Sequence, residues 1–166
     1  MNKSLLAIFA EDRFPHQAAI ALGSGQSLKI RFRALGDAQK AAQEIFLKER
    51  LTELGLDAEV AFRSLRGQLP DGEELAAFEA AIEALGETAA KQIESVAALS
   101  RGYGLSLVVG SLSLLEGKDE HPVDEAITAE TMAALPEDVK KAIEALAVSV
   151  QAPAKALDFL GQSPRF

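Results

Sequence analysis

The fold is decided first by residues 17–33, which read QAAIALGSGQSLKIRFR. Over residues 28–33 apolar and basic side chains alternate, and this period of two is typical of a strand with one buried face. The glycines in residues 23–26 supply the backbone freedom that a tight turn requires. We therefore predict antiparallel strands over residues 17–22 and 28–33, joined as a hairpin.

The regions on either side extend this hairpin differently. Residues 5–10 fit a further strand, which would make a small three-stranded meander. Downstream, Asp37 is expected to cap a helix whose apolar residues recur every three or four positions, and Gly55 is placed to end it. Residues 56–67 are compatible with a short helix, and Pro70 marks a loop after it.

A long amphipathic helix is predicted over residues 73–100, with a bend at Gly86. Its apolar residues step by three and four, and an isolated helix of this length needs a surface against which to bury them. We expect the strands, the first helix and a partner protein to share that surface. The residues of the stripe are Leu75, Phe78, Ile82, Leu85, Ala89, Ile93, Val96 and Leu99.

The segment after this helix has a mixed signal. The Gly102-Tyr103-Gly104 triplet is expected to interrupt the helix, and residues 105–115 fit either a strand or a buried helix; we favour helix. Residues 116–122 read as a polar turn. Thr128 is expected to cap a short helix through Ala134.

Pro136 suits the first position of a closing helix with one apolar face. That face consists of Val139, Ala142, Ile143, Leu146, Ala147 and Val150.

The resulting prediction is an α+β fold with an N-terminal β-hairpin or small meander and a helix-rich remainder that includes one long amphipathic helix. Residues 1–150 are expected to form a single domain, β-rich over 1–35 and helix-rich over 37–150. Residues 151–166 are expected to be a loosely ordered tail.

Composition narrows the classes of function. The 166 residues carry a net charge of −8, which repels phosphate backbones and disfavours nucleic-acid binding. Cysteine is absent, which excludes disulfides and thiolate metal sites and fits a reducing compartment such as the cytoplasm. No apolar run is long enough to span a membrane, so we expect no membrane association.

Motifs for catalysis and for cofactor binding are unmatched. His16 and His121 stand beside prolines without metal-ligand spacing, and no serine has the setting of a nucleophile elbow. The glycines at 23–25 are not followed directly by a helix, as a phosphate loop would require. We therefore predict no enzyme activity, no cofactor and no metal site.

Protein binding remains, by helix stripes, by a basic strand face or by the tail. The basic face is more simply a solvated face, and contact with an acidic partner is the alternative. The tail is either a docking segment or a loose end, and the sequence leaves both open. The candidate partner-binding residues are Lys29, Arg31, Arg33, Leu75, Phe78, Ile82, Leu85, Val139, Ile143, Leu146, Phe159 and Leu160.

Residues 107–123, LVVGSLSLLEGKDEHPV, and 127–139, ITAETMAALPEDV, combine an apolar segment, a charged turn and a Thr-x-Glu motif that ends in Leu-Pro. This order resembles the tail-assembly chaperones of long-tailed, siphophage-like phages, mainly over residues 105–150. The resemblance implies a protein of the bacterial host cytoplasm that coats the helical tape-measure protein and helps to recruit tail-tube subunits.

Two other classes stay open. The chain is alternatively a structural subunit of a virion or similar assembly, or a small ligand-binding protein or uncharacterised enzyme. Self-association into a homo-oligomer is compatible with each class.

Overall fold

A computed structural model describes residues 13–65 and 72–150 of the 166. The strand predicted at 5–10, the loop around Pro70 and the tail with Phe159 and Leu160 lie outside the described residues. The elements, in chain order, are β1 (His16–Ala21), β2 (Ser27–Phe32), α2 (Asp37–Glu53), α3 (Ala58–Leu65), α4 (Gly72–Leu85), the 3-10 turn η1 (Gly86–Thr88), α5 (Ala89–Val108), β3 (Val109–Glu116), β4 (Asp119–Pro122), α6 (Ala129–Ala133) and α7 (Glu137–Ser149).

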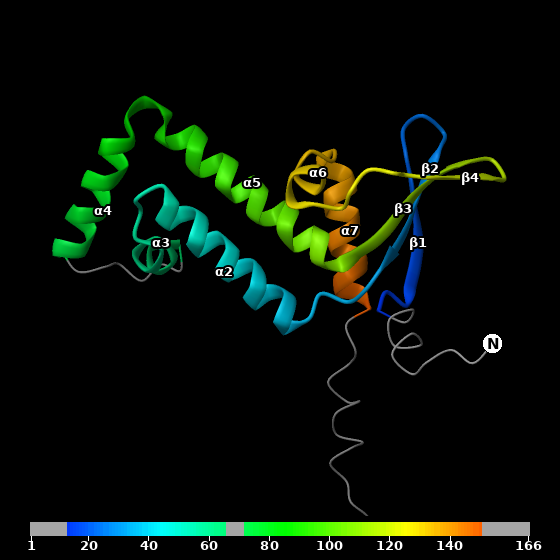
Figure 1. Cartoon of the computed structure of the whole chain (residues 1–166), viewed down its shortest axis with the longest axis horizontal. Coiled ribbons are helices and arrows are strands. Elements are labelled where there is room, and N and C mark those ends of the chain that lie inside the picture. The colour runs from blue at the N-terminus through cyan, green and yellow to red at the C-terminus, as the bar shows by residue number, and fades with distance from the viewer. Residues whose placement is uncertain (1–12, 66–71, 151–166) are drawn as a thin grey trace, which may run out of the picture.

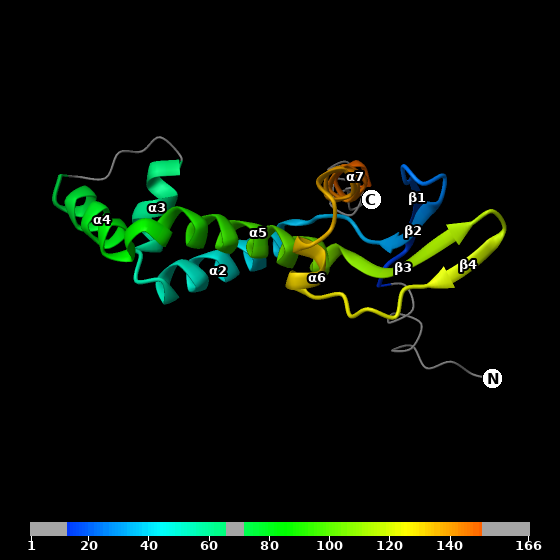
Figure 2. The same ribbon diagram turned by 90° about the horizontal axis from the view of Figure 1, so that it is seen from above.

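The predicted α+β class is confirmed, and the described part of the chain is elongated (Figure 1). An antiparallel sheet, in the order β1-β2-β3-β4, forms one end. Helices α2 to α5 form the other end, as the second view also shows (Figure 2). Helices α6 and α7 lie where the two ends meet, beside α5 (Figures 1 and 2).

The predicted hairpin is present, with each strand beginning and ending one residue earlier than expected. His16 pairs with Phe32 and Ala21 pairs with Ser27. Gly25 has a φ of 80°, a conformation that favours glycine, and the Leu22 amide donates to the Gln26 carbonyl at 2.8 Å. Turn chemistry and strand alternation therefore agree in this part of the chain.

The expectation of helix over residues 105–115 is wrong for most of that segment. Helix α5 continues to Val108, and the chain then enters β3, whose Leu112 pairs with Ile30 of β2. The predicted polar turn at 116–122 instead contains a tight turn at Gly117 and the edge strand β4. The four β4 residues read DEHP and are all exposed. They contain no apolar residues that alternate with polar ones, so the sequence pattern does not predict a strand.

The glycines predicted to interrupt the helix lie inside α5. A Cβ atom on Gly102 would be 2.1 Å from the Ala129 carbonyl oxygen, and one on Gly104 would be 2.8 Å from Cδ of Gln43. These positions are small because α6 and α2 approach α5 closely there. The glycines thus serve packing, and the helix does not break.

Residues 72–108 are helical throughout except at η1, which confirms the long helical run. Gly86 has a φ of 69°, and there α4 turns sharply away from the axis of α5 (Figure 1). This bend returns α4 toward α3, so that α2, α3, α4 and α5 surround one space.

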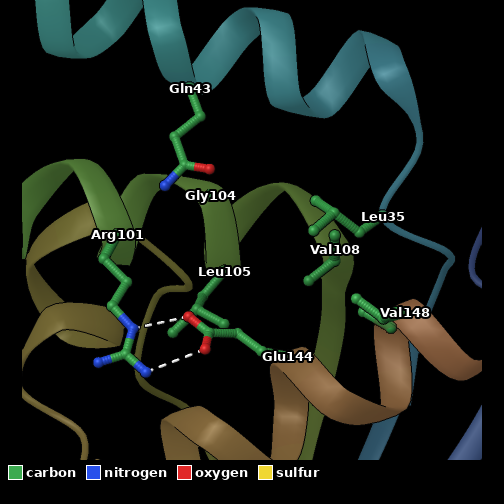
Figure 3. Close-up of a pocket in the computed structure, with 9 residues that line it drawn as sticks. Leu35, Gln43, Arg101, Gly104, Leu105, Val108, Glu144 and Val148 are labelled. Atoms are coloured by element: carbon green, nitrogen blue, oxygen red, sulfur yellow. Dashed lines mark hydrogen bonds and ion pairs between the residues drawn. The ribbon is translucent and has the colours of Figure 1, made fainter. Parts of the chain in front are cut away.

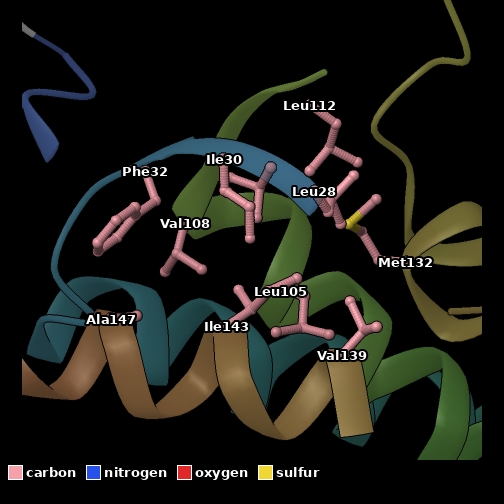
Figure 4. Close-up of a cluster of buried hydrophobic side chains, with 11 residues drawn as sticks. Leu28, Ile30, Phe32, Leu105, Val108, Leu112, Met132, Val139, Ile143 and Ala147 are labelled. Carbon is pink, nitrogen blue, oxygen red and sulfur yellow. The ribbon is translucent and has the colours of Figure 1, made fainter. Parts of the chain in front are cut away.

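The main core lies between the inner face of the sheet and helices α5, α6 and α7 (Figure 4). Ile30, Val108 and Ile143 are its most completely buried large side chains. A second, smaller cluster lies at the helical end, where Leu51, Leu56, Ala61 and Val96 are buried. Helices α2 and α5 connect the two ends.

Candidate partner-binding groove

An apolar groove of about 370 Å³ opens among the four helices of the helical end. Its volume is within the range of ligand-binding pockets. Every lining side chain is aliphatic or aromatic, so the groove offers a partner no side-chain hydrogen bond and no charge. The lining residues are Leu47, Leu51, Leu56, Ala61, Phe78, Ile82, Ile93 and Ala97.

The groove follows from the helical periodicity and from the bend at Gly86. Phe78 and Ile82 are one turn apart on α4 and share a face, which the bend directs toward α2 and α3. Both side chains are only half-buried, because the described residues place no further layer over them. Their apolar surface is therefore accessible from solvent.

Ion pairs connect the helices that frame the groove. Lys48 of α2 lies 3.2 Å from Glu59 of α3, and Arg63 of α3 lies 2.8 Å from Glu74 of α4. Hydrogen bonds to Glu59 and then to Glu44 raise the pKa of Lys48 above its ordinary value. Such surface pairs contribute little stability individually, but they orient α3 between its neighbours.

A second cavity, of about 240 Å³, lies between α2, α5 and α7 (Figure 3). Arg101 and Glu144 form a two-pronged ion pair beside it, with N–O distances of 2.6 and 2.9 Å. Hydrogen bonds to Glu144 and then Glu137 raise the pKa of Arg101 further. Because these charged groups satisfy one another, the pair connects α5 to α7 and does not offer a free charge to a ligand.

The predicted basic face has partners within the chain. Lys29 lies 2.7 Å from Glu120, Arg31 Nε donates to the Phe14 carbonyl at 2.9 Å, and Arg33 Nε donates to the Leu107 carbonyl at 2.5 Å. Lys29 and Arg31 belong to the outer face of the sheet, whereas Arg33 follows the end of β2. Contact with an acidic partner stays a prediction.

The two predicted stripes lie at different ends of the molecule. Phe78 and Ile82 line the groove, Leu85 packs on the same cluster, and Leu75 is half-buried on the same helix. The α7 stripe, by contrast, belongs to the main core.

The assignment of Val139 and Ile143 to a partner needs correction, because they are 3% and 1% exposed inside that core. Leu146 is half-buried and packs against the same core. Ile93 belongs to the predicted stripe, but five other groove residues were not predicted to bind a partner: Leu47, Leu51, Leu56, Ala61 and Ala97. The helical period marked Leu51 and Ala61 as apolar positions but did not mark Leu47, and nothing in the sequence indicated that α2 and α3 face α4.

Groups that could carry other chemistry do not converge. His16 is on β1 and His121 is on β4, at opposite edges of the sheet. The described residues contain no group of three or more His, Cys, Asp or Glu side chains that could hold a metal ion. Within the same residues, no helix has the length and apolar character of a membrane span. The predicted absence of enzyme activity stays a prediction.

No protein-family model, no curated protein and no solved structure matches the chain.

Proposed function

We propose that the protein is a non-enzymatic tail-assembly chaperone of a long-tailed phage that works in the host cytoplasm. In this proposal an amphipathic helix of the tape-measure protein lies with its apolar stripe in the groove among α2, α3, α4 and α5. The observation that carries the proposal is the groove itself, an accessible cavity with purely apolar side chains in its lining. Recruitment of tail-tube subunits is part of the same proposal and rests on the resemblance alone.

The chemistry of the groove favours a helical partner. Helix-in-groove recognition uses apolar anchors spaced at i, i+3, i+4 and i+7, which enter a cleft between helices of the receptor. Phe78 and Ile82 on one wall and Leu47 and Leu51 on another are themselves spaced by four residues. The apolar lining of the groove complements the apolar stripe of a partner helix, which would otherwise be exposed to water until assembly.

The residues that carry the family resemblance have a separate place in the molecule. Residues 105–150 supply the end of α5, strands β3 and β4, and helices α6 and α7. They contribute to the sheet and main core, whereas the groove is formed by residues 47–97. We infer that the resembling segment is the scaffold and that the helical end holds the partner.

The test is co-expression with the tape-measure protein encoded near this gene, followed by affinity purification through a tag on this chain. We expect the tape-measure protein to be soluble and recovered with the unaltered chain. Ile82→Asp and Ala97→Glu place a charge in the groove, so each should abolish recovery. Ala97 is exposed, which makes its substitution the milder one for folding.

Ile45→Asp is the matched control, because Ile45 is 57% exposed on α2 and lies outside the groove lining. It should leave recovery unchanged. Equal recovery with all three variants would reject the groove as the binding site. Retention of this chain in stoichiometric amounts in finished particles would favour a structural subunit. No recovery of any protein partner would favour the ligand-binding or enzyme classes.

A further inference from the structure

We infer that the groove selects helices whose apolar stripe is flanked by Lys or Arg along the edge that meets α4 and α5. This inference rests on the proposed function and specifies the chemistry of the partner. It follows from the charges that border the groove, which differ between its two sides.

The α4 side is bordered by carboxylates. Successive residues of a helix are rotated by about 100°. Ala81 faces the cavity that α4 forms with α3, and Ile82 faces the groove. Around the helix axis, in the direction that leads from Ala81 to Ile82, Glu79 lies about 60° beyond Ile82. Glu83 is one turn after Glu79, and both are exposed. They therefore form a row along the groove side of α4.

Helix α5 repeats this arrangement. Val96 is buried in the small cluster, Ile93 and Ala97 line the groove, and Glu94 lies about 60° beyond Ala97. Glu94 is exposed as well. The edge formed by α4 and α5 thus presents three carboxylates next to an apolar surface.

These carboxylates have no ion-pair contact with the described residues, and the one basic residue next to them in sequence is Lys91, three positions before Glu94 on α5. No described residue forms an ion pair with Glu79, Glu83 or Glu94, and α4 contains no Lys or Arg. The opposite side differs, because Lys48 of α2 lies 3.3 Å from Glu44 and 3.2 Å from Glu59. Negative potential therefore concentrates on one edge of the groove.

A basic-flanked helix is the partner that complements this edge. Long Lys and Arg side chains cover apolar surface with their methylene stems and extend the charge to its border, where Glu79, Glu83 and Glu94 lie. A second copy of this chain is a poor occupant, because its α4 would bring the same carboxylates and each copy has a net charge of −8.

The experiment measures binding of designed peptides to the full-length protein by fluorescence anisotropy. Three labelled amphipathic peptides share one Leu and Ala stripe and differ only in flanking residues, which are Lys, Gln or Glu. At low salt the Lys-flanked peptide should bind about tenfold more tightly than the Glu-flanked one. The difference should shrink at about 0.5 M NaCl because of screening.

Two charge variants assign the preference to the groove. Glu79→Lys combined with Glu83→Lys should reverse the order of the peptides. Asp124→Lys combined with Glu125→Lys changes the net charge equally at exposed positions outside the groove lining, so the order should persist. Ile82→Asp should weaken all three peptides, because it disrupts the apolar contact that they share.

Equal binding of the three peptides, together with weakening by Ile82→Asp, would overturn the charge selection and leave the groove proposal standing. A loss of preference in the Asp124 and Glu125 variant as large as in the Glu79 and Glu83 variant would also overturn it, because net charge alone would then account for the order. No binding of any peptide, or binding indifferent to Ile82→Asp, would reject groove docking and the inference with it.

Discussion

Gly102 is the residue with the tightest packing constraint described for α5. In Gly102→Ala the new Cβ would lie 2.1 Å from the Ala129 carbonyl oxygen and 2.7 Å from the Ala133 nitrogen, so the backbone of α6 must move. We expect a loss of about 1–3 kcal/mol in the free energy of unfolding, measured by urea denaturation. Gly23→Ala is the control, because no described residue other than its chain neighbours has an atom within 4 Å of its Cβ position. Equal stability of the two variants would contradict this packing role.

Glu137 should make stability depend on pH. Arg101 first, and Lys140 after it, hold the pKa of the Glu137 carboxyl below its ordinary value of 4.5. Because the folded-state pKa is depressed, the stabilisation is complete above the unfolded-state pKa and is lost as pH falls through the folded-state pKa.

The melting temperature of Glu137→Gln should therefore be lower at neutral pH and fall less steeply below about pH 5. Glu125→Gln should behave like the unaltered chain, since no ion pair of the described residues involves Glu125. If the melting temperatures of all three proteins changed with pH in parallel, the contact between Glu137 and Arg101 would contribute nothing to stability.

At the scale of single residues, helix caps could be predicted from the sequence because their hydrogen-bond partners lie within the same turn. Thr128 caps α6 as predicted, because its hydroxyl accepts from the Thr131 amide at 3.3 Å within the same turn. Asp37 is the first helical residue and Gly36 is the cap, where the Gln39 side chain accepts from the Gly36 amide at 3.0 Å. The cap is therefore one residue earlier than predicted, at the position whose backbone amide finds an acceptor in the Gln39 side chain three residues later.

At the scale of elements, the bend at Gly86 determines the groove. Gly86→Ala forces an L-residue into a φ of 69°, at a cost of about 1–2 kcal/mol, and favours a straight continuation of α4 into α5. We expect a lower melting temperature and weaker binding of the Lys-flanked peptide, because Phe78 and Ile82 would leave the groove. Anisotropy and thermal denaturation check both effects.

Gly72→Ala is the matched control. It lies in α4 at the other end of the helix, with open space around its Cβ position and no positive φ. Stability and binding should remain unchanged or improve slightly, since alanine has the higher helix propensity. Unaltered binding in Gly86→Ala would mean that the bend persists without glycine.

The elements that sequence could not determine are those fixed by distant partners. The apolar residues around Val108 and Val109 suit helix and strand equally. The chain changes from helix to strand at Val109, where β3 begins to pair with β2. Likewise, α7 and α4 have similar stripes. The sheet together with α5 and α6 covers Val139 and Ile143, whereas the described residues leave Phe78 accessible.

At the scale of the whole molecule, two clusters of unequal size predict unequal local stability. Among the described residues, eleven buried side chains form the main core, whereas four form the cluster of the helical end. Amides of α3 and α4 should therefore exchange with deuterium faster than those of β2 and α7, through local opening. Native-state hydrogen exchange with mass spectrometry checks this. Uniform protection across both ends would show that they unfold as one unit.

The groove as a whole was less predictable than any of its walls. The helical period indicated that Phe78 and Ile82 share an apolar face of their helix, and this was enough to predict them as partner-binding residues. It did not indicate that Leu51 and Ala61, from helices earlier in the chain, would stop short of covering them. Whether a stripe is covered depends on the lengths and angles of all four helices, which pairwise patterns do not contain.

An open apolar groove also affects how the protein behaves in concentrated solution. Colloidal stability then depends on mutual repulsion, which the net charge of −8 supplies and dissolved salt weakens. Light scattering should therefore show attraction between molecules that grows with ionic strength and as the pH approaches the isoelectric point near 4.8. Purification and storage are best done in dilute, mildly alkaline buffer, where the molecules keep apart without a ligand.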